Sequence, residues 1–215
     1  MDTQMIEPQS INSEHFVEAI SKSDAFAYPT PYLKQWVMKD RSAVAIRLIH
    51  PEDEPMMVKF HETLSMNSVY SRYFYYMKLN TRTKHKRLVQ ICSIDPEQEV
   101  VLVAIIPSSY RLAKRWGENK IIAVGRLNRL KETNDAEIAV LVSDQYQGLG
   151  LGTEILNRLL HIGHQANLDH VIAEILPDNA IMKRINEKLD FPVKHIFEDG
   201  LVKATFILNW KEQAI

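Results

Sequence analysis

A cluster of glycines follows a short apolar run in the second half of the chain, and the two together could bind a phosphate. Residues 138–142 read Ile-Ala-Val-Leu-Val, residues 147–153 read Gln-Gly-Leu-Gly-Leu-Gly-Thr, and three of the seven glycines of the chain lie between 148 and 152. The β-branched run predicts a buried strand. After the glycines, apolar residues recur at helical spacing and predict a helix that begins near Gly150; these residues are Leu151, Ile155, Leu156, Leu159 and Leu160.

A strand, a glycine turn and a helix form an arrangement suited to an anion. The first turn of a helix carries unpaired N–H donors and the positive end of the dipole, and glycine lets an anion approach the backbone closely. The alternative, which we disfavour, is that these glycines serve only to let the helix pack closely and bind no ligand. A P-loop would need Gly-Lys-Ser/Thr, which does not follow, and a dinucleotide fingerprint needs G-x-G-x-x-G, whereas the spacing here is G-x-G-x-G. The pattern therefore predicts a phosphate loop of another kind.

The composition predicts one globular domain without membrane or nucleic-acid partners. The 215 residues are 46% hydrophobic and 25% charged, with a formal net charge of −1, which gives no overall attraction to nucleic acid or an anionic membrane. No apolar run approaches the roughly 18 residues of a membrane span, and the N-terminus is polar, so neither a span nor a signal peptide is predicted. The single cysteine, Cys92, cannot form an internal disulfide, and a cytoplasmic location is expected.

The pattern of polar and apolar residues predicts an N-terminal arm or linker over residues 1–40 and a single domain over 41–215. Strands are expected at 44–49, 99–106, 121–127, 136–142 and 170–176, followed by a closing pair at 191–197 and 201–210 with Asp199-Gly200 as its turn. Helices are expected after Pro51, over 65–74, over 83–93, from Gly150 and from Asn179 to Leu189. The expected fold class is α/β with a mixed sheet and helices on both faces.

Gln147, Gly150 and Gly152 form the motif Q-x-x-G-x-G, which resembles the pyrophosphate loop of the GCN5-related N-acetyltransferase (GNAT) family. The order of elements over residues 43–210 also resembles the GNAT fold, a mixed and mostly antiparallel sheet of about seven strands flanked by helices. Segments 44–54, 64–74 and 136–140 resemble one branch, the acetyltransferase domain of bacterial protein-lysine acetyltransferases that are often fused to an acyl-CoA-synthetase-like module.

The resemblance implies acetyl-CoA as cosubstrate and no metal. It implies that backbone N–H groups of the glycine loop wrap the pyrophosphate, and that the strand before the loop splays from its neighbour at 170–176 to hold the pantetheine arm. A backbone N–H at Val142 could also stabilise an oxyanion. The implied cofactor-binding residues are Val140, Leu141, Val142, Gln147, Gly148, Leu149, Gly150, Leu151, Gly152, Thr153 and Asn179.

Glu137 is the candidate general base. A lysine amine has a pKa near 10.4 and must lose a proton before it can attack a thioester. A carboxylate at the acceptor end of the cleft can take that proton, directly or through a water, and the related branch uses a glutamate at this place in the strand. The alternative is a glutamate on the solvated face of a strand.

Other reactive residues receive structural interpretations. Many family members place a tyrosine acid near position 186; this chain has Asn186, so no general acid is assigned, and a CoA thiol with a pKa near 8.5 could be reprotonated by solvent. Asp190 replaces a glycine usual in the family. Cys92 is expected in the core, and His161 and His164 on a solvated helix face rather than at a metal. Two basic clusters are expected to be solvated surface; they are Arg82, Lys84, Lys86 and Arg87, and Arg111, Lys114 and Arg115.

The predicted function is transfer of an acetyl group from acetyl-CoA directly to an amine. A protein lysine is favoured over a small amine as the acceptor, and a non-catalytic acyl-CoA-binding module is the alternative outside enzymes. A protein acceptor requires an open groove rather than an enclosed pocket. The segments expected to border that groove are residues 107–119 and the helix region with Tyr70, Arg72, Tyr73 and Tyr76.

Overall fold

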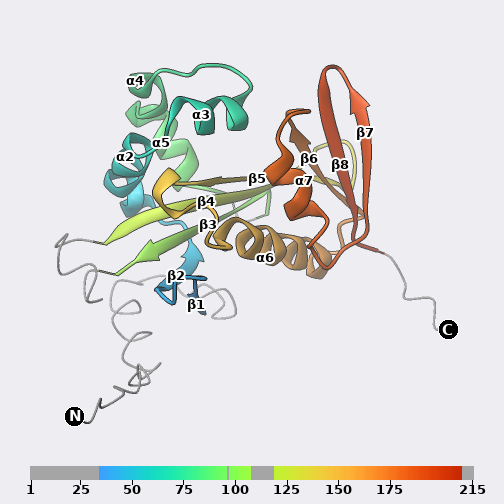
Figure 1. Cartoon of the computed structure of the whole chain (residues 1–215), viewed down its shortest axis with the longest axis horizontal. Helices are drawn as coiled ribbons and strands as arrows, with labels where there is room; N and C mark the ends of the chain where they lie inside the picture. Colours follow the sequence, from blue (N-terminus) through green and yellow to red (C-terminus); the bar gives the residue numbers. More distant parts are fainter. Residues whose placement is uncertain (1–33, 96, 108–118, 210–215) are drawn as a thin grey trace, which may run out of the picture.

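One sheet runs through the part of the chain that the computed structural model describes, residues 34–95, 97–107 and 119–209 (Figure 1). Its eight strands lie in the order β1-β2-β3-β4-β5-β6-β8-β7. The strands are β1 (Lys34–Val37), β2 (Ala43–Leu48), β3 (Glu99–Ile106), β4 (Lys120–Arg129), β5 (Ala136–Val142), β6 (His170–Ile175), β7 (Val193–Glu198) and β8 (Leu201–Ile207). Neighbouring strands are antiparallel except β5 and β6, which are parallel.

Helices cover both faces of the sheet, as expected (Figure 1). One face carries α2 (Glu54–Glu62), α3 (Met66–Tyr73), α4 (Leu79–Arg82) and α5 (His85–Cys92), and the other carries α6 (Leu151–Gln165) and α7 (Ala180–Asn186). Two short 3-10 turns, η2 (Pro51–Asp53) and η4 (Asp144–Tyr146), follow β2 and β5. The mixed, mostly antiparallel architecture predicted from the sequence is confirmed.

The sheet has eight strands rather than about seven because β1 lies within the predicted arm. Residues 34–37 pair with Ala43–Ile46 of β2, and Trp36 packs against the core. A strand of four residues between polar segments carries too little periodicity to predict. The closing hairpin turn is confirmed, since Asp199 and Gly200 have φ values of 50° and 79°. Residues 1–33 and most of the predicted excursion at 107–119 lie outside the described residues.

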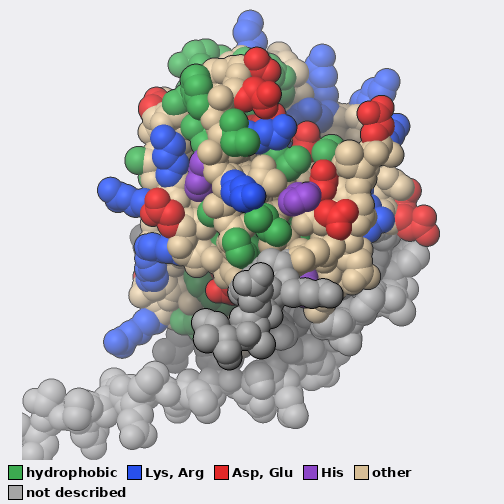
Figure 2. All heavy atoms as spheres, turned by 90° about the vertical axis from the view of Figure 1, so that its right-hand side faces the viewer, with side chains coloured by type: hydrophobic (Ala, Val, Ile, Leu, Met, Phe, Trp, Pro, Cys, Tyr) green, Lys and Arg blue, Asp and Glu red, His purple; other side chains and the backbone are tan. Residues whose placement is uncertain are grey.

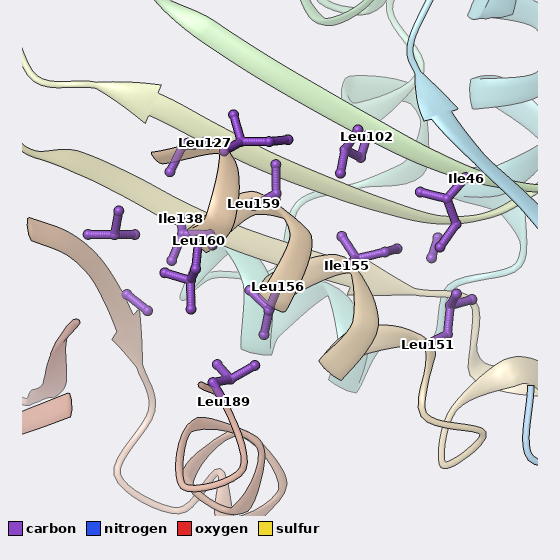
Figure 3. Close-up of a cluster of buried hydrophobic side chains, with 14 of the residues drawn as sticks. Ile46, Leu102, Leu127, Ile138, Leu151, Ile155, Leu156, Leu159, Leu160 and Leu189 are labelled. Carbon is purple, nitrogen blue, oxygen red and sulfur yellow. The ribbon is translucent and has the colours of Figure 1, made fainter. Parts of the chain in front are cut away.

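The apolar face predicted for α6 forms the larger core (Figure 3). Leu151, Ile155, Leu156, Leu159 and Leu160 are each at most 1% exposed, and they pack against β2, β3, β4 and β5. The helix approaches β4 so closely that a Cβ at Gly125 would overlap Ile155 Cγ2 and lie 2.9 Å from Leu159 Cδ1. Gly125 therefore sets the distance between α6 and the sheet.

A second core lies between the sheet and helices α2 to α5. Met57, Phe60 and Leu88 pack there against the other face of β3 and β4. Cys92 belongs to this core, and its pKa is raised to about 12, first by burial and then by the carboxylates of Asp53 and Glu54. The expectation that Cys92 is a core thiol is confirmed.

Two buried arginines hold the segments around the second core. Arg47 of β2 forms a bidentate ion pair with Asp53 of η2, at 2.6 Å from Nη1 and 2.7 Å from Nη2. Arg82 is 3% exposed and donates from Nε to Met77 O and from Nη1 to His61 O. The expectation that Arg82 belongs to a solvated cluster is wrong, because its buried guanidinium satisfies one carbonyl in the last turn of α2 and one in the loop before α4.

The β7–β8 hairpin ends the sheet (Figure 1). On the face viewed in Figure 2, basic, acidic and hydrophobic side chains are interspersed. The edge strand β7 exposes Ile196 and Phe197, but Lys194, His195 and Glu198 are exposed beside them. Charged residues on an edge strand disfavour pairing with another chain. Among the described residues no helix is long and apolar enough to cross a membrane.

Substituting Gly125 by alanine tests the close packing of α6. We expect Gly125→Ala to lower the free energy of unfolding by about 1–3 kcal/mol, because the new methyl group must displace Ile155 or the backbone of β4. Urea denaturation measures the change. In the double variant with Ile155→Ala, the clashing Cγ2 is gone, so the alanine at 125 should cost less than it does alone. Strictly additive effects of the two substitutions would contradict this packing.

Candidate active site

The parallel strands β5 and β6 separate after the first two residues of β5. Ala136 pairs with Val171 and Glu137 with Ile172, whereas β5 remains paired with β4 along its whole length to Val142. From Ile138 onward, one edge of β5 therefore has no strand beside it. The splay that the family resemblance implied is confirmed.

The unpaired edge of β5 presents N–H groups at specific residues. Ser143 donates its N–H to Ile122 O of β4 at 2.9 Å, and N–H groups of successive strand residues point to opposite edges. The N–H groups of Val142 and Val140 therefore point away from β4, into the gap toward β6. A donor in this position can bind an acceptor atom of a ligand that lies between the strands.

The glycine loop turns the chain from η4 into the first turn of α6. Gly148 and Gly150 have φ values of 77° and 91°, which favour glycine, and Gly150 is the N-cap residue of α6. The first turn of this 15-residue helix points its N–H groups at the end of the gap between β5 and β6. The predicted order of strand, glycine turn and helix is thus present in the fold.

A segment far away in the sequence covers the glycine loop. Lys39 donates its backbone N–H to Leu149 O at 3.2 Å, and a Cβ at Gly150 would lie 3.2 Å from Trp36 Cη2 and 3.6 Å from Lys39 Cε. The strand β1 and the turn after it therefore bring an amine to the glycine loop. Sequence reasoning missed Lys39, because nothing local in residues 34–40 indicates that they meet residues 149–150.

The gap and the glycine loop belong to one cleft of about 870 Å³. Leu149 is the one predicted cofactor-binding residue that does not line it; its side chain packs against the core. The predicted residues that line the cleft are Glu137, Val140, Leu141, Val142, Gln147, Gly148, Gly150, Leu151, Gly152, Thr153 and Asn179. The residues singled out from the sequence thus converge on one site.

Helix α7 closes the cleft on the side of β6. Asn179 caps this helix by accepting the N–H of Met182 at 3.0 Å, and it also lines the cleft. Asn186 is 1% exposed and is not among the lining residues, so this position offers no group to a ligand. Asp190, just beyond the helix, accepts from Asn157 of α6 at 2.7 Å and ties the two segments together.

A network of hydrogen bonds ties α3 to the loop that follows β5. Asp144 accepts the N–H of Ser65 at 2.9 Å, the Ser65 hydroxyl at 2.6 Å and the Ser68 hydroxyl at 3.0 Å. Gln147 donates from Nε2 to Ser68 Oγ at 3.0 Å and to Val142 O at 3.1 Å. The motif glutamine thus connects the end of β5, the glycine loop and α3.

At the other end of the cleft, polar side chains of β3, β4 and β5 share the face that carries α3. Glu137 lies opposite Asn128 of β4, and Arg126 lies two residues before Asn128, so their side chains are on one face. Glu137 is exposed, and Arg126 is ion-paired with Glu99 of β3. Arg72 of α3 joins the lining of the same cleft.

Of the four side chains expected to border an acceptor groove, Arg72 lines the cleft. Tyr70, Tyr73 and Tyr76 are not among the lining residues: Tyr70 and Tyr76 stack on each other with ring centroids 4.9 Å apart, and the guanidinium of Arg72 lies 5.3 Å from the centroid of the Tyr73 ring. The three tyrosines are therefore not part of the cleft wall, and their expected place at an acceptor groove is not found in this cleft.

The two histidines of α6 have partners at the far end of the helix. His164 Nδ1 lies 2.9 Å from Leu208 O, and His161 Nε2 lies 3.4 Å from Asp190. Phe191 contacts both rings. Over the described ranges, no three histidine, cysteine or acidic side chains are grouped as metal ligands would be.

The sequence matches known acetyltransferases. The profile of the acetyltransferase (GNAT) domain matches residues 44–192. An acetyltransferase of Pseudomonas aeruginosa is 27% identical over 151 residues, which are 69% of this chain and 75% of that protein.

Solved structures share the fold. The GNAT domain of S. lividans PAT is 28% identical and superposes with a TM-score of 0.71, over 84% of this chain and 99% of that one. The PaiA N-acetyltransferase of Thermoplasma acidophilum, solved in complex with coenzyme A, is 13% identical with a TM-score of 0.58, over 77% and 99% of the two chains. At that identity the likeness shows the fold alone.

Asp144 should stabilise the protein in a pH-dependent way. Partial burial alone would raise its pKa, but the hydrogen bonds from Ser65 and Ser68 outweigh this and lower the pKa below its usual value. A lowered pKa in the folded state means that the stabilisation is complete above the unfolded pKa of about 3.9 and is lost as the pH falls through the folded value.

We therefore expect Asp144→Asn to cost about 1 kcal/mol of unfolding free energy at pH 7 and progressively less in acid below about pH 4. Urea denaturation of both proteins across this pH range measures the difference. Asp178→Asn, which alters an exposed side chain near α7, is the control. It should leave the free energy of unfolding unchanged both at pH 7 and in acid. A cost that is independent of pH would show that the carboxylate charge is not the stabilising feature.

Proposed function

The chain belongs to the GNAT acetyltransferase family, and from this premise we propose that it transfers the acetyl group of acetyl-CoA directly to the amine of a protein lysine. Acyl-CoA-dependent N-acetyltransferases are the enzyme class to which its relatives assign it. The observation that carries the proposal is the convergence of the unpaired edge of β5 and the N-terminus of α6 on one cleft. The acceptor and the roles of individual residues are our inferences.

In the proposed complex, the pyrophosphate of acetyl-CoA lies against the glycine loop and the first turn of α6. Backbone N–H groups and the helix dipole favour a negative group there, and the positive φ of Gly148 and Gly150 shapes the loop. Lys39 brings a positive charge to the same loop and is proposed to contact a phosphate. The complex of the Thermoplasma acidophilum relative with coenzyme A supports this choice of ligand.

The pantetheine arm then runs along the open edge of β5. Its amides can exchange hydrogen bonds with backbone groups of residues 138–142 that have no strand beside them. Val142, the oxyanion position that the family resemblance implied, adjoins the loop and lies about 17 Å along the strand from Glu137, so it would meet the start of the arm. The thioester carbonyl would lie nearer to Glu137, by the N–H of Val140, which also points into the gap. That N–H is our candidate for stabilising the oxyanion when the amine attacks the carbonyl carbon.

Glu137 is the proposed base. It lies on the same strand as Val142, is exposed to the cleft, and is at the end of the cleft away from the glycine loop. The carboxylate takes one proton from the acceptor ammonium, directly or through a water, and the neutral amine then attacks the thioester carbon. As the C–S bond breaks, the second proton leaves the nitrogen to solvent and CoA departs as a thiolate that solvent can reprotonate. Glu174 of β6 is a second exposed carboxylate in the cleft, and it is the alternative base.

A lysine side chain is favoured as the acceptor for two reasons. The residues quoted above resemble protein-lysine acetyltransferases, and exposed side chains such as Glu137 and Ile181 line the cleft, so its acceptor end is open rather than enclosed. A small amine would need a pocket that surrounds most of its surface. An open cleft admits a side chain that projects from a larger surface.

A carboxylate placed in the glycine loop should abolish cofactor binding. Gly148→Asp introduces a negative charge where the pyrophosphate is proposed to lie, and nothing lies within 4 Å of a Cβ at this position. We expect isothermal titration calorimetry to detect no acetyl-CoA binding, while the circular dichroism spectrum stays native. Gly150→Asp should also abolish acetyl-CoA binding, although the new side chain would also contact Trp36.

Gly200→Asp is the matched control. Gly200 has nearly the same φ as Gly148, 79° against 77°, and a Cβ there likewise meets nothing within 4 Å, but it lies in the β7–β8 turn. This variant should bind acetyl-CoA as the wild type does. Undiminished affinity in a folded Gly148→Asp protein would remove the loop from the cofactor site.

Replacing the proposed base should slow transfer without weakening cofactor binding. We expect Glu137→Gln to keep its acetyl-CoA affinity and to lose roughly 100- to 10,000-fold in rate near neutral pH. The defect should shrink as the pH rises toward the amine pKa of about 10.4, because more acceptor then arrives neutral. The assay is transfer of labelled acetyl groups from acetyl-CoA to the proteins of a cell extract.

Glu174→Gln serves as the comparison, since it removes the other exposed carboxylate of the cleft. A large defect in this variant instead of Glu137→Gln would transfer the role to Glu174. Label recovered in the small-molecule fraction alone would favour a small amine as the acceptor. Tight acetyl-CoA binding with no label transferred to either fraction would favour the non-catalytic binding module.

A further inference from the structure

A guanidinium without a carboxylate partner lies at the acceptor end of the cleft. Among the described residues Arg72 takes part in no ion pair; its contact is with the ring of Tyr73, 5.3 Å from the centroid. The guanidinium of Arg87 lies at the same distance from that ring, so Tyr73 contacts both arginines. Arg72 is half-buried and lines the cleft.

The other charges of this region do not neutralise Arg72. Arg126 is neutralised by its ion pair with Glu99. Burial lowers the pKa of Arg72, and nearby Arg126 and Arg87 act in the same direction, whereas Tyr73 and Glu137 act against them. An arginine side chain stays protonated at neutral pH even so, which leaves a positive charge partly removed from water.

This charge conflicts with the proposed reaction unless the acceptor brings a negative group. A lysine amine arrives as an ammonium, which Arg72 repels, and Glu137 loses its negative charge when it takes the proton. The region around Arg72 would then hold an uncompensated cation during transfer. A carboxylate on the acceptor would satisfy the guanidinium through charge-assisted hydrogen bonds, and it would also offset the repulsion of the ammonium.

We propose that Arg72 recognises an acidic side chain that flanks the acceptor lysine, so that the enzyme selects lysines in acidic sequence contexts. The inference rests on the proposed function and specifies its substrate class. Its geometric basis is the position of Arg72 on α3, which lines the same cleft as Glu137, near Arg126, whose charge is already paired with Glu99. The bonds from Ser65 and Ser68 to Asp144 hold α3, and so Arg72, in place.

A set of short peptides tests the inference. Each peptide has blocked ends and a single lysine among neutral residues. In the reference peptide, all positions that flank the lysine are glutamine. In each of the other peptides, one glutamine at position −2, −1, +1 or +2 from the lysine is replaced by glutamate. For the wild type we expect at least one glutamate peptide to exceed the glutamine peptide about tenfold in kcat/KM, mainly through KM, which is the usual effect of one hydrogen-bonded charge pair. CoA release at saturating acetyl-CoA is the readout.

The Arg72→Gln variant should acetylate the glutamate and glutamine peptides equally well and bind acetyl-CoA normally. Arg72→Lys keeps the charge but not the fork of donors, so it should retain part of the preference. Lys86→Gln, on the exposed side of α5 and outside the cleft, makes the same change of charge and should keep the full preference.

Equal rates for all peptides with the wild type, or a preference that persists in Arg72→Gln, would overturn the inference while leaving the proposed function intact. If Arg72→Gln lowers kcat/KM equally for the glutamate and glutamine peptides, the inference is also overturned, because Arg72 would then act on the amine or on Glu137. No transfer to any peptide, together with turnover of small amines, would overturn both the inference and the protein-lysine acceptor.

Discussion

The separation of β5 from β6 is the constraint on which the site depends. A strand inside a sheet normally satisfies its backbone groups on both sides, but β5 has a partner on the β6 side only at Ala136 and Glu137. Each strand has its own neighbours beyond this point: α6 packs against β4 and β5, while β6 pairs with β8 on its other edge. A ligand between the strands would take the place of the missing partner, and a ligand that binds only the folded protein also stabilises it.

The two ends of the cleft are mechanically connected through α3. Asp144 and Gln147 belong to the loop proposed to hold the cofactor, and both bond to the N-terminal end of α3. Arg72 lies on the same helix, four residues after Ser68, and therefore on the same side of it. A shift of the glycine loop would thus also move the side chain proposed to recognise the acceptor. Gln147 of the motif therefore has a structural role besides any contact with the ligand. Its side-chain amide donates to Ser68 Oγ on α3 and to Val142 O at the end of β5.

The sequence was sufficient for features that depend on local pattern. The β-branched run of β5, the glycine loop and the apolar face of α6 were all predicted, because strand, turn and helix each impose their own spacing on neighbouring residues. The family resemblance supplied the splay of β5 and the candidate base, which spacing alone does not show. Features formed by long-range contacts were missed. Lys39 meets Gly150 across more than a hundred residues, and Arg82 is buried because carbonyl groups of another helix need a donor.

The distribution of ionisable groups indicates where the proposed reaction needs help from the protein. A thiolate whose conjugate acid has a pKa near 8.5 is a good leaving group, whereas an amine with a pKa near 10.4 is almost fully protonated at neutral pH. The difficult proton transfer is therefore at the acceptor. The structure agrees with this difference. Asn186 of α7 is buried outside the cleft and offers no acid for the thiolate, whereas Glu137 and Arg72 both line the cleft at its acceptor end. An arginine stays protonated at neutral pH, so Arg72 cannot take the acceptor proton itself. Its benefit comes from binding, which is why we assign it to recognition of the acceptor.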